Sequence, residues 1–112
     1  MAKRDTDTSE YAKIKAMGHP QRRKVMAAIA GQENAKAISP VEISKQLEVP
    51  LTDVSYHVRV LVRCKAIALT RTKQVRGSQQ HFYLPNAEFL ALPWVALILG
   101  PNGAPTLTTE AA

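Results

Sequence analysis

Cysteine, acidic residues and long apolar runs are all scarce in this sequence, and each scarcity excludes a class of protein. Cys64 is the only cysteine among the 112 residues, which excludes an internal disulfide framework and nearly excludes a cysteine-based metal cluster. No apolar run reaches the roughly 20 residues that a membrane-spanning helix needs. Residues 1–10 lack the apolar stretch of a secretory signal peptide. We therefore expect a cytoplasmic protein without a membrane partner.

Acidic residues are missing from a long central part of the chain. The sequence has a net charge of +6, with 15 Lys and Arg against 9 Asp and Glu. Residues 54–86 hold six basic residues and no Asp or Glu. A run of like charge is usually only a solvated surface, but this bias is stronger than solubility requires. It indicates an acidic partner, and nucleic acid is the first candidate.

Start and stop signals predict three helices in the first half of the chain. Ser9 can cap a first helix that ends near residue 17, and Gly18 and Pro20 separate it from a second helix that ends near residue 30. The letters SPVE, residues 39–42, form a capping box with proline at the first helical position. This box opens a short third helix, which the letters EVP at residues 48–50 end.

Residues 54–61, VSYHVRVL, fit the period of a strand as well as that of a helix. Their three valines and their alternation favour a strand. The alternation fails at Val62, whereas the helical period continues. That period gives one apolar face, formed by Val54, Val58 and Leu61. We therefore predict a fourth helix over residues 51–64, with a polar and basic opposite face.

After residue 66 the pattern changes to a hairpin and then to an apolar segment. Within residues 67–84, residues 67–73 and 81–84 read as two strands around a glycine-bearing turn over residues 75–79, with a basic tip. Residues 87–100 are expected to form a helix that Pro93 kinks or restarts. Eight large apolar side chains crowd 11 positions of this segment, so it needs burial against the domain or against a second copy. Residues 1–8 and 101–112 are expected to be disordered.

A helix-turn-helix followed by a hairpin is the winged-helix arrangement, a mainly α fold with a small β-hairpin (α+β). The major groove of DNA, about 12 Å wide, admits one α-helix, and the preceding helix crosses behind it. Residues 9–86 would form this domain, with residues 51–64 as the recognition helix and residues 67–84 as the wing. Base edges would be read by Thr52, Ser55, Tyr56 and Arg59. The DNA backbone would be contacted by Arg22, Arg23, Lys45, Arg63, Arg71, Lys73 and Arg76.

Three blocks of the sequence resemble ArsR-like winged helix-turn-helix transcription regulators. IKAMGHPQRRKVMAAIA is similar to the opening of these proteins, VEISKQLEVPLTDVSYHVRVLVRCKAI to their helix-turn-helix, and LTRTKQVRGSQQHFYLP to their wing. The resemblance implies that the DNA-facing part of the recognition helix consists of Leu51, Thr52, Asp53, Ser55, Tyr56 and Arg59. It also implies a homodimer interface between the first and last helices, formed here by Tyr11, Ile14, Phe89, Leu90, Trp94, Leu97 and Ile98.

The sequence departs from this family at the turn and at the metal sites. Glu48 stands where the turn usually has glycine. Some members bind metals through a cysteine pair or through carboxylate–histidine pairs, and this chain has neither. A zinc site made of His19, His57 and His81 would need three residues that lie far apart in the sequence. We expect no metal or other cofactor, and a structural or DNA-proximal role for His57.

Together these patterns predict a sequence-specific regulator that binds double-stranded DNA as a homodimeric repressor and is associated with the nucleoid through that binding. Two alternatives remain open. One is a protein-interaction module on the same scaffold, in which residues 89–99 bind a different protein. The other is a regulator that responds to a small molecule or a metal. We do not expect an enzyme, because the sequence shows no paired carboxylates, phosphate loop or nucleophile motif.

Overall fold

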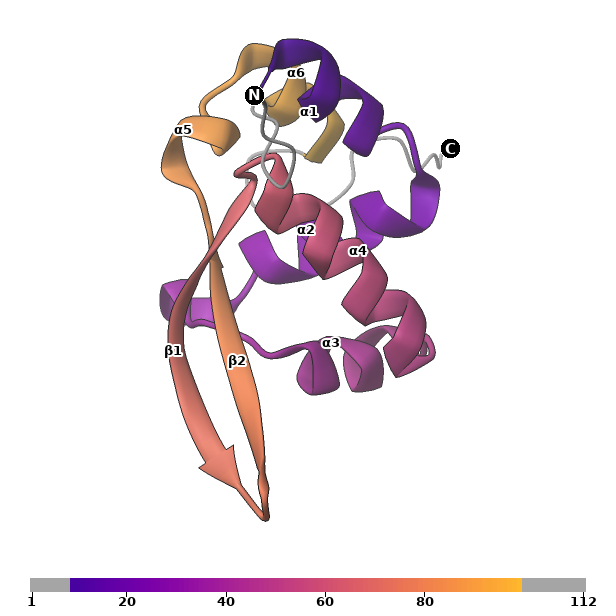
Figure 1. The fold of residues 1–112 in the computed structure, drawn as a ribbon. Helices are drawn as coiled ribbons and strands as arrows, with labels where there is room; N and C mark the ends of the chain where they lie inside the picture. The colour runs from indigo at the N-terminus through magenta and orange to yellow at the C-terminus, as the bar shows by residue number, and fades with distance from the viewer. Residues whose placement is uncertain (1–8, 100–112) are drawn as a thin grey trace, which may run out of the picture.

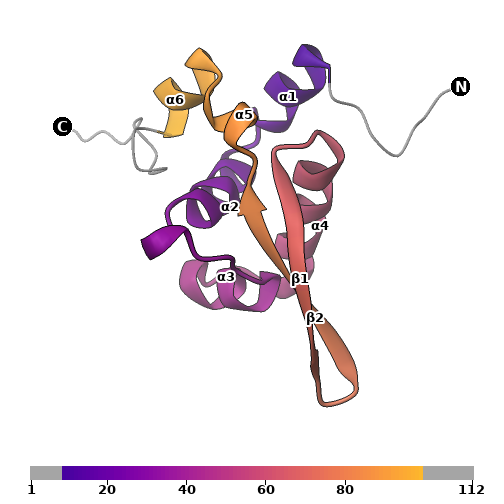
Figure 2. The same ribbon diagram turned by 90° about the vertical axis from the view of Figure 1, so that its left-hand side faces the viewer.

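The computed structural model describes residues 9–99, which form six α-helices, one 3-10 turn and one two-stranded hairpin. The elements follow in the order α1 (Glu10–Ala16), α2 (Pro20–Ala30), η1 (Glu33–Ala35), α3 (Pro40–Leu47), α4 (Leu51–Arg63), β1 (Ile67–Val75), β2 (Ser78–Pro85), α5 (Ala87–Leu90) and α6 (Pro93–Leu99). Helices α2, α3 and α4 pack together, the hairpin projects from one end of the molecule, and α1, α5 and α6 lie at the other end (Figures 1 and 2). The mainly α fold class with a hairpin is confirmed. The disorder predicted for residues 1–8 and 101–112 concerns residues outside the described part.

The predicted helix starts are confirmed in atomic detail. The Ser9 hydroxyl accepts a hydrogen bond from the Ala12 amide at 3.1 Å and caps α1. At the start of α3, the Ser39 hydroxyl accepts from the Glu42 amide at 3.3 Å, and the Glu42 carboxylate accepts from the Ser39 amide at 3.1 Å. These reciprocal bonds make a complete capping box, which satisfies amides that the helix itself leaves without partners.

The ambiguous segment at residues 54–61 is helical, as predicted. It lies inside α4, which begins at Leu51 and ends at Arg63, with Cys64 as its C-cap. Val54, Val58 and Leu61 are at most 4% exposed and face the core, so burial of this face outweighs the strand propensity of the valines.

The hairpin is longer than the sequence predicts. Its strands pair antiparallel from Ile67 with Pro85 to Val75 with Ser78, so only Arg76 and Gly77 remain in the turn. Much of β1 and the start of β2 are exposed to solvent. Because neither face is buried near the tip, polar side chains occupy both faces of the strands there. The alternation that identifies a half-buried strand is lost there, which explains why the prediction placed the turn over residues 75–79.

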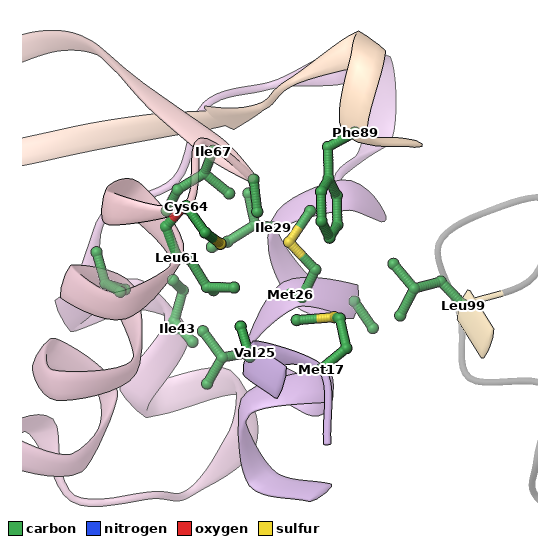
Figure 3. Close-up of a cluster of buried hydrophobic side chains, with 14 of the residues drawn as sticks. Met17, Val25, Met26, Ile29, Ile43, Leu61, Cys64, Ile67, Phe89 and Leu99 are labelled. Atoms are coloured by element: carbon green, nitrogen blue, oxygen red, sulfur yellow. The ribbon is translucent and has the colours of Figure 1, made fainter. Parts of the chain in front are cut away.

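One apolar core lies between α2, α4, the base of the hairpin and the C-terminal helices. Val25, Met26 and Ile29 of α2 meet Leu61 of α4 and Ile67 of β1 there, and none of these five is more than 2% exposed (Figure 3). Phe89 and Leu99 close the core from the C-terminal side (Figure 3). This shared core fixes α4 and the base of the hairpin relative to each other.

The apolar segment after the hairpin forms two short helices in the described residues. The Asn86 side chain accepts from the Glu88 amide at 2.9 Å and caps α5. Pro93 then begins α6, so the proline restarts the helix, which is one of the two outcomes the sequence left open.

Candidate nucleic-acid interface

The outer face of α4 presents side chains of the kinds that contact DNA. Thr52, Tyr56, Arg59 and Arg63 are exposed, and Ser55 is half-buried beside them. Leu51 and Asp53 are exposed in the first turn of the helix. Because the opposite face is anchored in the core, the helix can offer this polar face without losing its packing.

The turn before α4 holds a left-handed residue that is not glycine. Glu48 has φ 57° and ψ 46°, the conformation that a glycine usually supplies at this position. The chain beyond it is held by Ser44, whose carbonyl accepts from the Val49 amide at 3.2 Å and whose hydroxyl donates to the Val49 carbonyl at 2.6 Å. The tight turn that sets the angle between α3 and α4 therefore forms despite the departure at Glu48.

The wing carries three exposed basic side chains, Arg71, Lys73 and Arg76. Arg71 follows a register shift in the sheet, and its guanidinium lies 4.0 Å from the centre of the buried Phe82 ring. This cation–π contact holds the charge over an apolar surface and restricts where it can point. At the tip, Arg76 and Gly77 have φ values of 45° and 80°, so both residues are left-handed, as a two-residue hairpin turn requires.

The wing is tied to the helical part by backbone hydrogen bonds at its base. The amide and carbonyl of Ile38, just before α3, bond to the carbonyl and amide of Tyr83 at 3.1 and 3.0 Å. Burial raises the pKa of the Tyr83 phenol, and the positive charge of Arg59 partly opposes that rise. Arg59 of α4 therefore lies near the root of the wing.

Two of the predicted DNA-contacting arginines form hydrogen bonds at the junction between α1 and α2. Arg22 is 8% exposed, and its Nη1 donates to the Ala16 carbonyl at the end of α1, at 3.1 Å. A guanidinium nitrogen of the half-buried Arg23 donates to the Met17 carbonyl at 2.8 Å. Arginine is well suited to the free carbonyls at a helix C-terminus. The expectation that Arg22 contacts phosphate is therefore corrected, because its charge is buried and already bonded. Lys45, by contrast, is exposed on α3.

Sequence reasoning missed a buried polar cluster around His57. This side chain is 3% exposed on the flank of α4. Its Nδ1 accepts from Arg22 Nε at 3.2 Å, and its Nε2 lies 2.9 Å from the Gln21 amide oxygen. The ring of His19 contacts it edge-on, with 4.6 Å between the ring centres. The helical period of α4 places His57 next to the core face, and this position was the one feature of the sequence that indicated its burial.

The predicted dimer residues fall into two groups in this structure. Tyr11, Ile14 and Leu97 are 70%, 51% and 75% exposed, which is high for large apolar side chains. Leu90, Trp94 and Ile98 are half-buried against the core. Phe89 is 2% exposed inside the protomer, so the expectation that it forms part of an interface is corrected.

A hydrogen bond joins the first and last helices into one surface. Trp94 Nε1 donates to the Glu10 carboxylate at 2.8 Å, although the two residues are 84 positions apart. Both helices lie at the end of the molecule opposite the wing tip (Figure 2). The first and last described helices are therefore joined at the end of the molecule opposite the wing tip.

Metal and membrane features are not evident in the described residues. Among residues 9–99 there is no group of three or more His, Cys, Asp and Glu side chains that could hold a metal ion. Within the same range, every helix is too short or too polar to cross a bilayer.

Comparison with known proteins identifies the central segment. Residues 17–69 match a family model described as a helix-turn-helix domain. No curated protein sequence matches the chain significantly. Among solved structures, reduced HlyU from Vibrio cholerae has 22% sequence identity and a TM-score of 0.60, over 81% of this chain and 87% of that one. PagR of Bacillus anthracis, a transcriptional repressor, has 23% identity and a TM-score of 0.51, over 77% of this chain and 83% of that one.

The matched segment runs from the end of α1 to the start of the wing and includes both helices of the helix-turn-helix. The fold beyond it, with a β-hairpin wing and terminal helices, is shared with the two bacterial regulators. The central segment therefore matches a helix-turn-helix domain in sequence, and the chain as a whole has the fold of winged-helix regulators.

Proposed function

We propose that this protein is a sequence-specific repressor that binds double-stranded DNA as a homodimer. The observation that carries the proposal is the exposed face formed by α4 and the wing, most of which belongs to residues 54–86, a stretch of 33 residues without Asp or Glu. DNA carries a dense array of phosphates, and a surface of this kind gains affinity by releasing their counterions.

In this proposal α4 is the recognition helix. Its anchored back leaves the polar face free to enter the major groove, where Thr52, Ser55, Tyr56 and Arg59 read base edges. Arginine is the most specific of these readers, because its planar guanidinium can bond two acceptors of one guanine. Leu51 and Asp53 sit where the helix enters the groove.

Backbone contacts position the helix in the groove. The wing supplies Arg71, Lys73 and Arg76, and the helix-turn-helix supplies Lys45 and Arg63. Arg23 retains a partial role, since it is half-buried and one of its nitrogens already bonds α1. Arg22 is not among these contacts, because its guanidinium is buried and already bonded to His57 and to the Ala16 carbonyl.

A homodimer would pair the faces of α1 and α6. Their exposed Tyr11, Ile14 and Leu97 would lose contact with water, while the wings remain outside the interface. Two recognition helices would then reach successive major grooves about 34 Å apart, on an imperfect palindrome. The similar fold of a known transcriptional repressor, PagR, supports repression as the outcome.

Selection of bound duplexes from a random-sequence pool tests the DNA-binding proposal. A recovered palindrome whose half-sites are one helical turn apart is the expected result. Size-exclusion chromatography with light scattering tests the dimer in parallel. A monomer that enriches no sequence would refute the proposal and favour a protein-interaction module on the same scaffold.

A further inference from the structure

The cluster around His57 connects three helices through one ring. His57 belongs to α4, and both ring nitrogens are engaged by α2, through Arg22 Nε at 3.2 Å and Gln21 Oε1 at 2.9 Å. Arg22 in turn bonds the last carbonyl of α1 through a second nitrogen. The recognition helix is thus tied by side-chain hydrogen bonds to the two helices behind it.

These hydrogen bonds fix the protonation state of the ring. Arginine has only N–H donors and stays charged, so the Nδ1 that faces Arg22 must carry a lone pair. Nε2 then carries the proton and donates it to the Gln21 amide oxygen. The observed arrangement therefore requires a neutral His57 with its hydrogen on Nε2.

A second proton on this ring would meet an unfavourable environment. Burial lowers the pKa of His57 most, and the nearby Arg22 and His19 lower it further, while Asp53 one turn earlier on α4 opposes them. The adjacent Tyr56 ring is the remaining titratable group in contact, with 5.4 Å between ring centres. A proton on Nδ1 would also point at the Arg22 Nε–H and break that hydrogen bond.

The cluster lies directly beside the proposed DNA-reading face. The Arg22 guanidinium is 5.7 Å from the centre of the Tyr56 ring, which is 51% exposed. Tyr56 and Val60 of α4 also line a groove together with Tyr11, Lys15 and His19. A change in the hydrogen bonds of His57 would therefore alter the surroundings of Tyr56, a side chain that we propose contacts bases.

We propose that neutral His57 is a positioning residue for the recognition helix, and that its protonation loosens α4 from α1 and α2 and weakens DNA binding. This inference rests on the proposed function. If bound protein requires the neutral ring, affinity falls up to about tenfold for each pH unit below the pKa of His57 in the free protein. Because that pKa is lowered from 6.5, the loss begins below about pH 6.5.

The direction of this effect separates His57 from the other histidines. A proton added to the exposed His19 or to His81 on the wing brings positive charge and strengthens attraction to phosphate. Acid would thus increase DNA affinity if only those two residues mattered. A decrease in acid identifies a group whose charged form is incompatible with the bound state.

The test compares wild-type protein with His57→Gln, whose amide keeps a donor and an acceptor but does not titrate. Binding to the duplex that the wild type selects is measured by fluorescence anisotropy from about pH 8 down to about pH 5.5. We expect wild-type affinity to fall over this range by at most about tenfold, because the pKa of His57 lies below 6.5, and the affinity of His57→Gln to stay level or rise. His19→Gln is the matched control and should retain the fall. Thermal unfolding of each variant over the same range verifies that it is folded.

A second measurement reports on the ring without DNA. Nitrogen NMR of labelled histidine should show a proton on Nε2 of His57 near neutral pH and a titration midpoint below about 6.5. A ring protonated on Nδ1 near neutral pH would overturn the inference. The same pH profile for wild type and His57→Gln would refute this inference alone, whereas a wild type that binds no duplex at about pH 8 would refute the proposed function as well.

Discussion

Arg76→Asn is expected to weaken DNA binding while leaving the wing folded, because the structure separates the charge of this residue from its conformation. Arg76 and Gly77 have φ values of 45° and 80°, and a turn with two left-handed residues favours Asn followed by Gly. Asparagine tolerates this region better than a long side chain does. The substitution therefore removes a positive charge from the wing tip and keeps or improves the turn.

The size of the effect follows from counterion release. Each phosphate contact contributes about 0.9 to the slope of log affinity against log salt concentration. A dimer with two wings loses two contacts, so the slope should become shallower by about 1.8. When salt is raised fourfold, the affinity gap between wild type and variant should shrink about tenfold.

Anisotropy titrations at several salt concentrations measure this slope, and urea unfolding measures the stability of the variant. Lys36→Ala removes the same charge from an exposed site that belongs neither to α4 nor to the wing, and it should leave the slope close to that of the wild type. An unchanged slope for Arg76→Asn would refute contact between the wing tip and phosphate. A large loss of stability would refute the description of the turn.

Three further predictions address the rest of the molecule. Arg59→Ala should cost about 1–3 kcal/mol on the selected duplex and much less on random DNA, and an equal loss on both would contradict base reading. Ser39→Ala should lower the free energy of unfolding by about 1–2 kcal/mol in urea, because no water can replace the fully buried hydroxyl of this cap, and Ser9→Ala at the exposed cap of α1 should cost less. Ile14→Asp should give a folded monomer in light scattering, since a dimer would bury the new carboxylate, and a persistent dimer would place the interface elsewhere.

The sequence alone predicted the features that depend on residues close together in the chain, namely the capping box of α3 and the length of α4. Ser39, Pro40 and Glu42 lie within four positions, and their spacing alone specifies the capping box that the structure contains. The length of α4 followed from a helical apolar period that continues beyond the alternation of its valines. In both cases the deciding contacts are separated by only a few residues, so the sequence displays them directly.

The role of Arg22 could not be predicted in this way. In the sequence it stands beside Arg23 and Lys24, and a run of basic residues usually faces solvent. Its actual partners are His57, which is 35 residues away, and a carbonyl that is free only because α1 ends there. A contact of that kind depends on how three helices pack, which no period or spacing in the sequence records.

Phe89 illustrates the same limit for apolar residues. The segment after the hairpin contains so many large side chains that its burial was certain, but the sequence does not distinguish the core of one protomer from a surface shared by two. The capped turn of α5 directs Phe89 inward, where its ring meets Trp94 edge-on with 6.0 Å between the ring centres. Tyr11 and Leu97, by contrast, remain exposed on the surface of the protomer.

The buried thiol of Cys64 has a practical consequence for the study of this protein. The thiol is 3% exposed, and burial raises its pKa, so little of the reactive thiolate is present near neutral pH. Since Cys64 is the only cysteine, the natural chain should react slowly with thiol-directed labels. A cysteine placed at position 76 would then take up a spin label selectively. In the proposed homodimer, the distance between the two labels would report the separation of the two wings, with and without DNA.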